Sequence, residues 1–239
     1  MTFWLNLAAF LLVVVVNYLA NALPIGGKTT GELSNQLEVI ITPAGYAFSI
    51  WGLIYLLLGI WVLRMAPKRR RNLPMYNETS LYFILSCLLN SAWVICWHNE
   101  LFLTSVAIMI GLLVTLIVLY LKLKELNVGF LDKLPFSIYL GWISVATIVN
   151  ISYYLVFIGW DGWGISAPTW TVIMLVVATI LAIVFRVEHA DWVYPLVFVW
   201  AFVAIGVKNM EPYPSVAYVA YALAAVIFIM TFLGRRKRN

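Results

Sequence analysis

Long apolar runs dominate the chain, and most charged residues fall between them. The hydropathy pattern has eight apolar stretches, at residues 3–22, 46–65, 80–97, 100–122, 136–158, 168–186, 192–207 and 214–233. A membrane-spanning helix needs about 20 mostly apolar residues, and only the seventh stretch is clearly short. The pattern therefore predicts an all-α integral membrane protein with about eight transmembrane helices.

Composition excludes a soluble domain. Hydrophobic residues make up 64% of the 239 residues and charged residues 10%, whereas a soluble domain is roughly half apolar and a quarter charged. The chain cannot cover a water-facing surface with so few charges.

The charge placement predicts an orientation. The net charge is +5, and the basic residues cluster at Arg64–Arg71 and at the C-terminal Arg235–Arg238, beside apolar runs. Lys and Arg accumulate on the cytoplasmic side of membrane proteins and attract anionic lipid head groups. We therefore expect a multi-pass protein of the plasma membrane with both termini cytoplasmic, membrane lipids as partners, and no nucleic-acid partner.

Ionisable residues are absent from the middle of the predicted spans. Such residues mark proton relays, ion pathways and Schiff-base counter-ions, so proton-driven pumps and acid–base enzymes are disfavoured. The predicted topology puts His98 and His189 on opposite sides of the membrane, where they cannot share a metal. We expect no catalytic acid–base residue, no metal site and no obligatory cofactor.

The polar residues inside the spans are uncharged amides, hydroxyls and indoles. Asn90 and Trp93 share one helix face, and Trp142, Ala146 and Asn150 share another, at about 100° per residue. Two interpretations remain open for these stripes. The amides could hold helices together by hydrogen bonds, or the stripes could line a pocket that stacks a flat apolar ligand.

Tryptophan falls into two groups. Seven residues lie near predicted helix ends, where an aromatic belt at the membrane interface accounts for them: Trp4, Trp61, Trp97, Trp160, Trp163, Trp170 and Trp192. Four lie deeper in their spans: Trp51, Trp93, Trp142 and Trp200. The motifs below include the first three of these, and Trp200 is left without an explanation.

Three of the predicted spans carry ordered motifs. The second contains Pro43, Phe48, Trp51, Tyr55 and Gly59; the third contains Leu81, Tyr82, Leu89, Asn90 and Trp93; the fifth contains Pro135, Trp142, Ala146, Thr147 and Asn150. Together they resemble the tryptophan-rich sensory protein (TspO/MBR) family, also called the translocator protein or peripheral benzodiazepine receptor family. The resemblance implies a TspO-like five-helix bundle over residues 1–158, followed by three additional transmembrane helices and a basic tail over 159–239.

The resemblance also implies a ligand site. In the family, a pocket for porphyrins and other flat lipophilic molecules such as sterols lies under the long first loop, which corresponds to about residues 23–45 here. Carried over by position, Trp51 and Trp142 match aromatics that flank the ligand and are linked to light-dependent porphyrin breakdown, and Asn90 matches a pocket amide. The expected ligand-binding residues are Trp51, Tyr55, Asn90, Trp93, Trp142, Ala146 and Asn150.

The resulting functional hypothesis is an integral membrane binding protein, a sensor or carrier, for a tetrapyrrole or a similar lipophilic small molecule. Three alternatives stay open: a transporter of a neutral or amphipathic solute, a light-dependent porphyrin-degrading enzyme that uses Trp redox chemistry, and a structural protein in which the amides only join helices. A homodimer is also left open.

Overall fold

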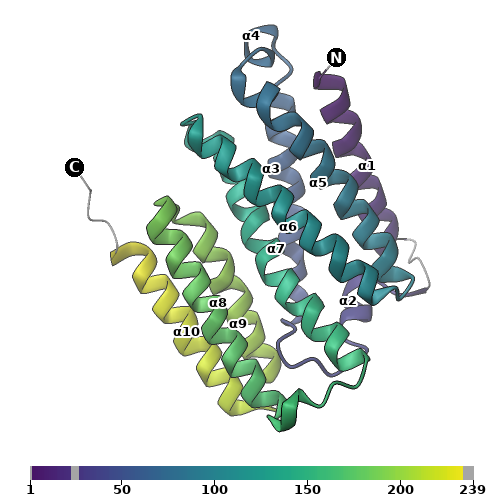
Figure 1. Cartoon of the computed structure of the whole chain (residues 1–239), viewed down its shortest axis with the longest axis vertical. Coiled ribbons are helices and arrows are strands. Elements are labelled where there is room, and N and C mark those ends of the chain that lie inside the picture. The colour runs from purple at the N-terminus through teal and green to yellow at the C-terminus, as the bar shows by residue number, and fades with distance from the viewer. Residues whose placement is uncertain (1, 23–26, 234–239) are drawn as a thin grey trace. The chain divides into compact units, whose positions relative to one another are not determined.

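The computed structural model describes residues 2–22 and 27–233, and this part of the chain is helical with no strands (Figure 1). The α-helices are α1 (Thr2–Ala22), α2 (Thr30–Ser34), α3 (Ile50–Arg64), α4 (Lys68–Arg71), α5 (Pro74–His98), α6 (Phe102–Glu125), α7 (Phe130–Phe157), α8 (Ala167–His189), α9 (Val193–Asn209) and α10 (Pro214–Leu233). Two 3₁₀ helices, η2 (Gly45–Ser49) and η3 (Gly162–Gly164), join them.

Every apolar stretch that the sequence predicts as a span is a helix, so the all-α membrane fold is confirmed. Seven helices in the described range are long and apolar enough to cross a membrane. The remaining one, α9, has 17 residues, which gives about 25 Å at 1.5 Å per residue against a hydrocarbon core of about 30 Å. The protein is a multi-pass integral membrane protein.

Two helices begin earlier than hydropathy predicts. Helix α5 starts at Pro74 and α7 at Phe130, ahead of the expected residues 80 and 136. Their first turns are polar, so a hydropathy window does not detect them. Pro74 stands in the first turn of α5, where a missing N–H costs nothing, while Pro135 lies inside α7.

The chain forms two compact units. Unit 1 comprises Met1–Gln36 and Ser49–Asn150, and unit 2 comprises Leu37–Phe48 and Ile151–Asn239. Part of the long first loop therefore belongs with the C-terminal helices. The domain boundary expected at residue 158 stays a prediction.

Helices α5, α6 and α7 end in the same way. After each, one residue turns left-handed: Glu100 at φ 57°, Asn127 at 47° and Gly159 at 68°. The amide after each turn reaches back five residues, as Leu101 N does to Cys96 O at 2.9 Å. This Schellman geometry satisfies the last carbonyls and makes the α5–α6 connection only three residues long, Asn99–Leu101.

In unit 1, α5 pairs with α6, and α1 packs on α5 and α3. The Gly59 side of α3 lies so close to α1 that a Cβ there would be 2.9 Å from the Phe10 ring. At one end of the unit, Arg64 and Arg70 both bind the carboxylate of Asp132, at 3.1 and 2.9 Å. The basic cluster is therefore partly neutralised by the first turn of α7.

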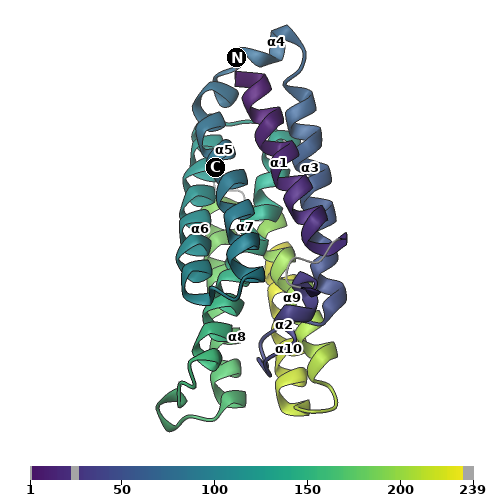
Figure 2. The same cartoon turned by 90° about the vertical axis from the view of Figure 1, so that its right-hand side faces the viewer.

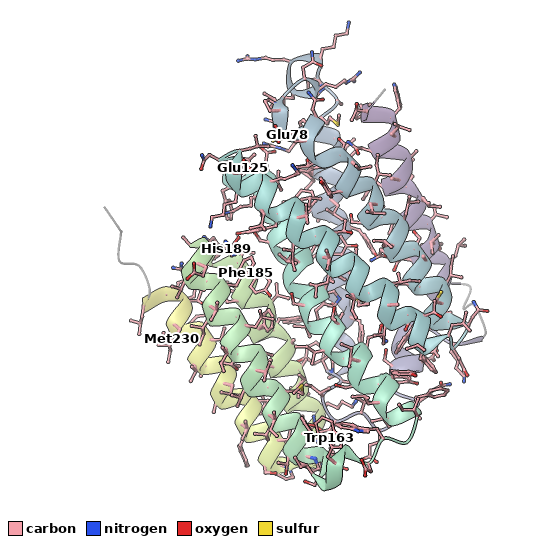
Figure 3. All side chains as sticks on the ribbon, in the orientation of Figure 1. Glu78, Glu125, Trp163, Phe185, His189 and Met230 are labelled. Atoms are coloured by element: carbon pink, nitrogen blue, oxygen red, sulfur yellow. The ribbon has the colours of Figure 1, made fainter. Side chains whose placement is uncertain are left out.

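In unit 2, α8, α9 and α10 pack on one another (Figure 2). Helices α9 and α10 approach closely, because a Cβ on Gly206 would lie 2.5 Å from the Tyr221 ring. Asp191 caps α9 by accepting the amides of Val193 and Tyr194 at 2.8 and 3.2 Å. Figure 3 shows Trp163 at the turn that precedes α8, and Phe185 and His189 near the other end of that helix.

The prediction that the tryptophans near helix ends form an aromatic belt at the membrane interface is wrong for two of them. Trp61 is fully buried, with its ring centroid 4.9 Å from that of Tyr76 and 5.1 Å from that of Phe136. Trp97 is also buried, stacked on Trp93 at 5.9 Å. Both residues are close to helix ends in sequence, but their faces point into unit 1, so they are packing residues.

Candidate functional site

An aromatic cluster in unit 1 is centred on Trp51, in the first turn of α3. Its ring centroid lies 5.6 Å from Tyr55, 6.3 Å from Trp93, 6.0 Å from Tyr139 and 6.4 Å from Trp142. Tyr55 stacks on Trp51, whereas Tyr139 and Trp142 meet it edge to face, which are the favoured aromatic geometries. Three helices, α3, α5 and α7, thus contribute rings to one cluster.

Helical spacing explains how these rings meet. Trp51 and Tyr55 are four residues apart on α3, and Tyr139 and Trp142 are three apart on α7, so each pair shares a face. Trp93, Tyr139 and Trp142 are buried, whereas Trp51 and Tyr55 are only half-buried. Within unit 1, the Trp51–Tyr55 side is the more accessible part of the cluster.

Asn90 is a hydrogen-bond hub beneath the rings. Its Oδ1 accepts from Asn17 Nδ2 at 2.8 Å and from the Tyr55 hydroxyl at 3.3 Å, and its Nδ2 donates to the Tyr139 hydroxyl at 3.1 Å. Asn90 itself is fully buried. One amide on α5 therefore links α1, α3 and α7 in an apolar environment, where unpaired polar groups are costly.

A second hub is formed by Asn150 near the C-terminal part of α7. Its Oδ1 accepts the Trp93 indole N–H at 2.9 Å, and its Nδ2 donates to Ser105 Oγ on α6 at 3.1 Å. Both Asn150 and Ser105 are buried. Because Trp93 contacts Trp51, this hub and the aromatic cluster form one network.

Six of the expected site residues are joined in this network: Trp51, Tyr55, Asn90, Trp93, Trp142 and Asn150. Ala146 lies one turn beyond Trp142 on α7 and is half-buried. As a small side chain, it leaves space and adds no polar group. Assignment of all seven residues to a ligand site stays a prediction.

Sequence reasoning did not include Tyr139, Asn17 and Ser105 in the site. Tyr139 could have been found, because it precedes Trp142 by three residues and so shares its face. Ser105 had no such signal, since its partner Asn150 is 45 residues away. Asn17 is an amide inside the first predicted span, but nothing in the sequence pairs it with Asn90, 73 residues further on.

The chemistry of the network is that of uncharged stacking and hydrogen bonding. The amides do join helices, as one of the two interpretations expected, and the aromatic faces could in addition stack a flat ligand. Within the described residues, no group of three or more His, Cys, Asp or Glu side chains could hold a metal ion.

The short helix α2 in the first loop packs on the end of α5. Thr30 Oγ1 and His98 Nε2 are 3.0 Å apart, both residues are buried, and Leu33 is buried as well. Glu32 closes a capping box with Thr29, whose amide and hydroxyl donate to its carboxylate and lower the pKa of Glu32. This part of the first loop therefore has a defined helical structure.

The fold and this uncharged network define the class of protein: a multi-pass helical membrane protein with an aromatic and amide core. Residues 3–233 match the model of a family described as TSPO-like protein. The chain belongs to this TSPO-like family, as its motifs indicate. The match includes the last three helices, which lie beyond the stretch where the motifs are found. Neither a curated protein nor a solved structure matches the chain.

Proposed function

We propose that this protein is an integral membrane binding protein, a sensor or carrier, for porphyrin-like or other flat lipophilic molecules, with a tetrapyrrole as the leading ligand. The observation that carries the proposal is the meeting of Trp51, Trp93 and Trp142 in one cluster. Lipophilic ligand sites are lined by aromatic side chains with a few placed polar groups. The TspO resemblance assigns the same residues to a pocket.

The polar groups of the cluster suit the edge of such a ligand. Tyr55 donates to Asn90 at 3.3 Å, the longest hydrogen bond of the hub, and Tyr55 and Trp51 are the half-buried members. When a ligand stacks on Trp51, the Tyr55 hydroxyl would stop donating to Asn90 and would donate to the polar edge of the ligand instead. Asn90 Oδ1 would still accept from Asn17, so neither Asn90 nor Tyr55 would be left unpaired.

Titration of purified protein with protoporphyrin tests the proposal. We expect a saturable shift of the porphyrin absorbance band together with quenching of Trp fluorescence. Trp51→Phe should weaken binding about three- to tenfold, which corresponds to the free energy contributed by one aromatic pair. Trp163→Phe is the matched control, because Trp163 is 76% exposed and its ring contacts Trp160 and Trp170. Quenching without a saturable component would refute the proposal.

One observation favours a second candidate, light-dependent degradation of bound porphyrin. Trp51 and Trp142, which the resemblance links to that chemistry, meet edge to face at 6.4 Å. With no acid or base in the cluster, the reaction would need light, oxygen and Trp oxidation. A porphyrin product with a changed absorption spectrum that forms under illumination with the wild type and does not form with Trp142→Phe would support this candidate. An identical spectrum before and after illumination would exclude it.

We further propose that the protein lies in the plasma membrane with both termini cytoplasmic, among membrane lipids. The basic clusters support this orientation. Epitope tags at the two termini should be reached by antibody only after cells are permeabilised. Labelling of one terminus in intact cells would contradict the proposal and would indicate that the 17-residue α9 does not cross the bilayer. A homodimer stays a prediction.

A further inference from the structure

Three tryptophans form a separate cluster at the turn between α7 and α8, within unit 2 (Figure 3). The ring centroid of Trp163 lies 5.4 Å from that of Trp160 and 5.9 Å from that of Trp170, and the last two centroids are 5.4 Å apart. We call these three residues the indole triad. None of them belongs to the aromatic cluster around Trp51, and a change at Trp163 leaves that cluster intact.

The backbone of this turn is left-handed at three successive residues. Gly162, Trp163 and Gly164 have φ angles of 66°, 55° and 76°. Glycine adopts such angles freely, whereas a residue with a Cβ is strained in them. The sequence places a bulky tryptophan at the strained middle position. Strained residues that the surrounding structure holds in place are concentrated at ligand sites, so this outlier directs attention to the triad.

Contacts within the turn hold the triad in place. Trp170 Nε1 donates to Gly162 O at 2.7 Å, and Asp161 Oδ1 accepts the amide of Trp163 at 2.9 Å. A Cβ on Gly162 would lie 3.1 Å from the Trp170 ring, so the close approach of the ring requires glycine there. The arrangement of the rings is therefore set by the turn itself, before any ligand binds.

The three rings present an open aromatic surface. Trp163 is 76% exposed, so its neighbours cover little of its two faces, and Trp160 and Trp170 are half-buried. Their planes are inclined to that of Trp163 by 81° and 62°. One cation above this surface can lie within about 6 Å of all three centroids, the range of cation–π attraction. An interfacial belt explains indoles near a helix end, but it requires neither a shared surface nor a strained backbone.

The charge beside the triad also favours a cation. Asp161 is exposed, and it is the only charged residue between Lys133 and Arg186 in the sequence. Indoles donate hydrogen bonds but do not accept them, and Asp161 Oδ1 is already engaged by the Trp163 amide. A primary ammonium would lose hydrogen bonds to water here without replacing them. A quaternary ammonium has no such bonds to lose, and aromatic surfaces recognise it.

The position of the turn indicates where this cation comes from. The turn joins α7 to α8, and both helices are long and apolar enough to cross a membrane, so the triad lies at the level of the lipid head groups. Phe157, Ile158 and Ile165 beside it are exposed and can contact acyl chains. We propose that the indole triad and Asp161 bind the quaternary ammonium head group of a phospholipid. This site does not depend on the proposed function.

Fluorine NMR on the full chain, labelled with 5-fluorotryptophan and held in maltoside detergent, tests this inference. Trp163→Phe assigns the Trp163 resonance by its loss. The probe is dihexanoylphosphatidylcholine, and dihexanoylphosphatidylglycerol is the matched lipid with the same chains and no cation. We expect the choline lipid to shift the Trp163 resonance saturably and to bind at least about fivefold more tightly than the glycerol lipid. Equal affinities for the two lipids would overturn the inference.

A leucine variant separates recognition of the cation from simple apolar anchoring. Trp163→Leu keeps an apolar side chain and removes the aromatic face, so affinity for the choline lipid should fall about two- to fivefold. The Trp160 resonance, assigned by its loss in Trp160→Phe, reports this binding. Trp192→Leu is the matched change at another exposed indole of unit 2, and it should bind as the wild type does. Unaltered affinity in Trp163→Leu would refute the role of the triad.

Asp161→Asn keeps a side-chain oxygen for the Trp163 amide and removes only the charge. Binding of the choline lipid should weaken about two- to fivefold, and raised salt should weaken it further in the wild type but not in this variant. The same salt response in both proteins would overturn the role of Asp161.

Free choline distinguishes a lipid from a soluble ligand. Choline should bind at least about tenfold more weakly than the choline lipid, because it has no acyl chains to contact Phe157 and Ile158. Equal affinities of free choline and the lipid would overturn the assignment to a phospholipid head group.

Discussion

At the scale of single residues, the buried amides explain how apolar helices find a unique arrangement. Asn90 joins side chains from three other helices, and Asn150 joins two. Interhelical hydrogen bonds in membrane proteins are each worth about 0.6 kcal/mol, up to about 2, so their energy is modest. Their effect on which arrangement forms is larger, because any other rotation of a helix about its axis leaves an unpaired polar group in hydrocarbon.

Replacing Asn90 by Leu should lower the free energy of unfolding by about 2 kcal/mol, because Asn17, Tyr55 and Tyr139 all lose a partner. Unfolding in mixed detergent measures this change. Asn99→Leu is the control, since Asn99 is exposed and bonds only its own helix at Ile95. Equal stabilities of the two variants would show that the hub contributes nothing.

The motif residues of this network were predictable, whereas their partners were not. Trp51, Asn90 and Trp142 stand in ordered motifs on separate helices, so resemblance finds them. Trp200 bonds a carbonyl 153 residues earlier, and no local pattern reports such a pair. The burial of Trp61 was also missed, because position near a helix end does not reveal which face points inward.

At the scale of helices, the structural details that matter most lie at the helix ends and at the points where two helices approach closely. Hydropathy located every long helix, but polar first turns and left-handed ends depend on capping geometry that hydropathy does not see. Of the three left-handed residues that end α5, α6 and α7, Glu100 is the least suitable, since a Cβ costs about 1–2 kcal/mol there.

Glu100→Gly should therefore stabilise the protein by about 1 kcal/mol, less the entropy that glycine adds to the unfolded chain. Glu100 is exposed, so no packing is lost. Glu100→Ala keeps the Cβ and removes the rest of the side chain with its charge, and should leave the stability unchanged. A stabilisation of the same size in both variants would mean that charge, not backbone conformation, is the cause.

Gly206→Ala should destabilise the protein by about 1 kcal/mol. The new Cβ would lie 2.5 Å from the Tyr221 ring, and overpacking costs about 1–3 kcal/mol, partly offset by the better helix propensity of Ala. Gly111→Ala in α6 is the control, because its Cβ would be 3.9 Å from Leu89 and should be neutral or stabilising. The thermal midpoint in detergent checks both, and a stabilised Gly206→Ala would contradict the close packing of α9 on α10.

At the scale of the whole chain, sequence order and spatial grouping differ. The motifs end near residue 150, which suggests an independent N-terminal bundle, yet Leu37–Phe48 packs with the C-terminal helices. The family match over residues 3–233 likewise covers parts of both units. Such grouping could not be predicted, because the segment is joined to α9 mainly through backbone carbonyls, which every sequence has.

Truncation after residue 158 should leave residues 37–48 without their hydrogen-bond partners on α9. Limited proteolysis with proteinase K should then cleave within this segment, while the full chain stays intact there. Mass spectrometry of the fragments locates the cut. Equal resistance of the two proteins would show that the segment has other, sufficient support.

The attachment of an early segment to a late helix also sets an order of events during synthesis. Val39 and Ile40 can meet Lys208 and Asn209 only after 169 further residues have been made. At about 5–20 residues per second, this takes on the order of ten seconds or more. Throughout that interval the nascent loop exposes apolar side chains and unpaired carbonyls, so a chaperone or the insertion machinery has a defined window in which to act on it.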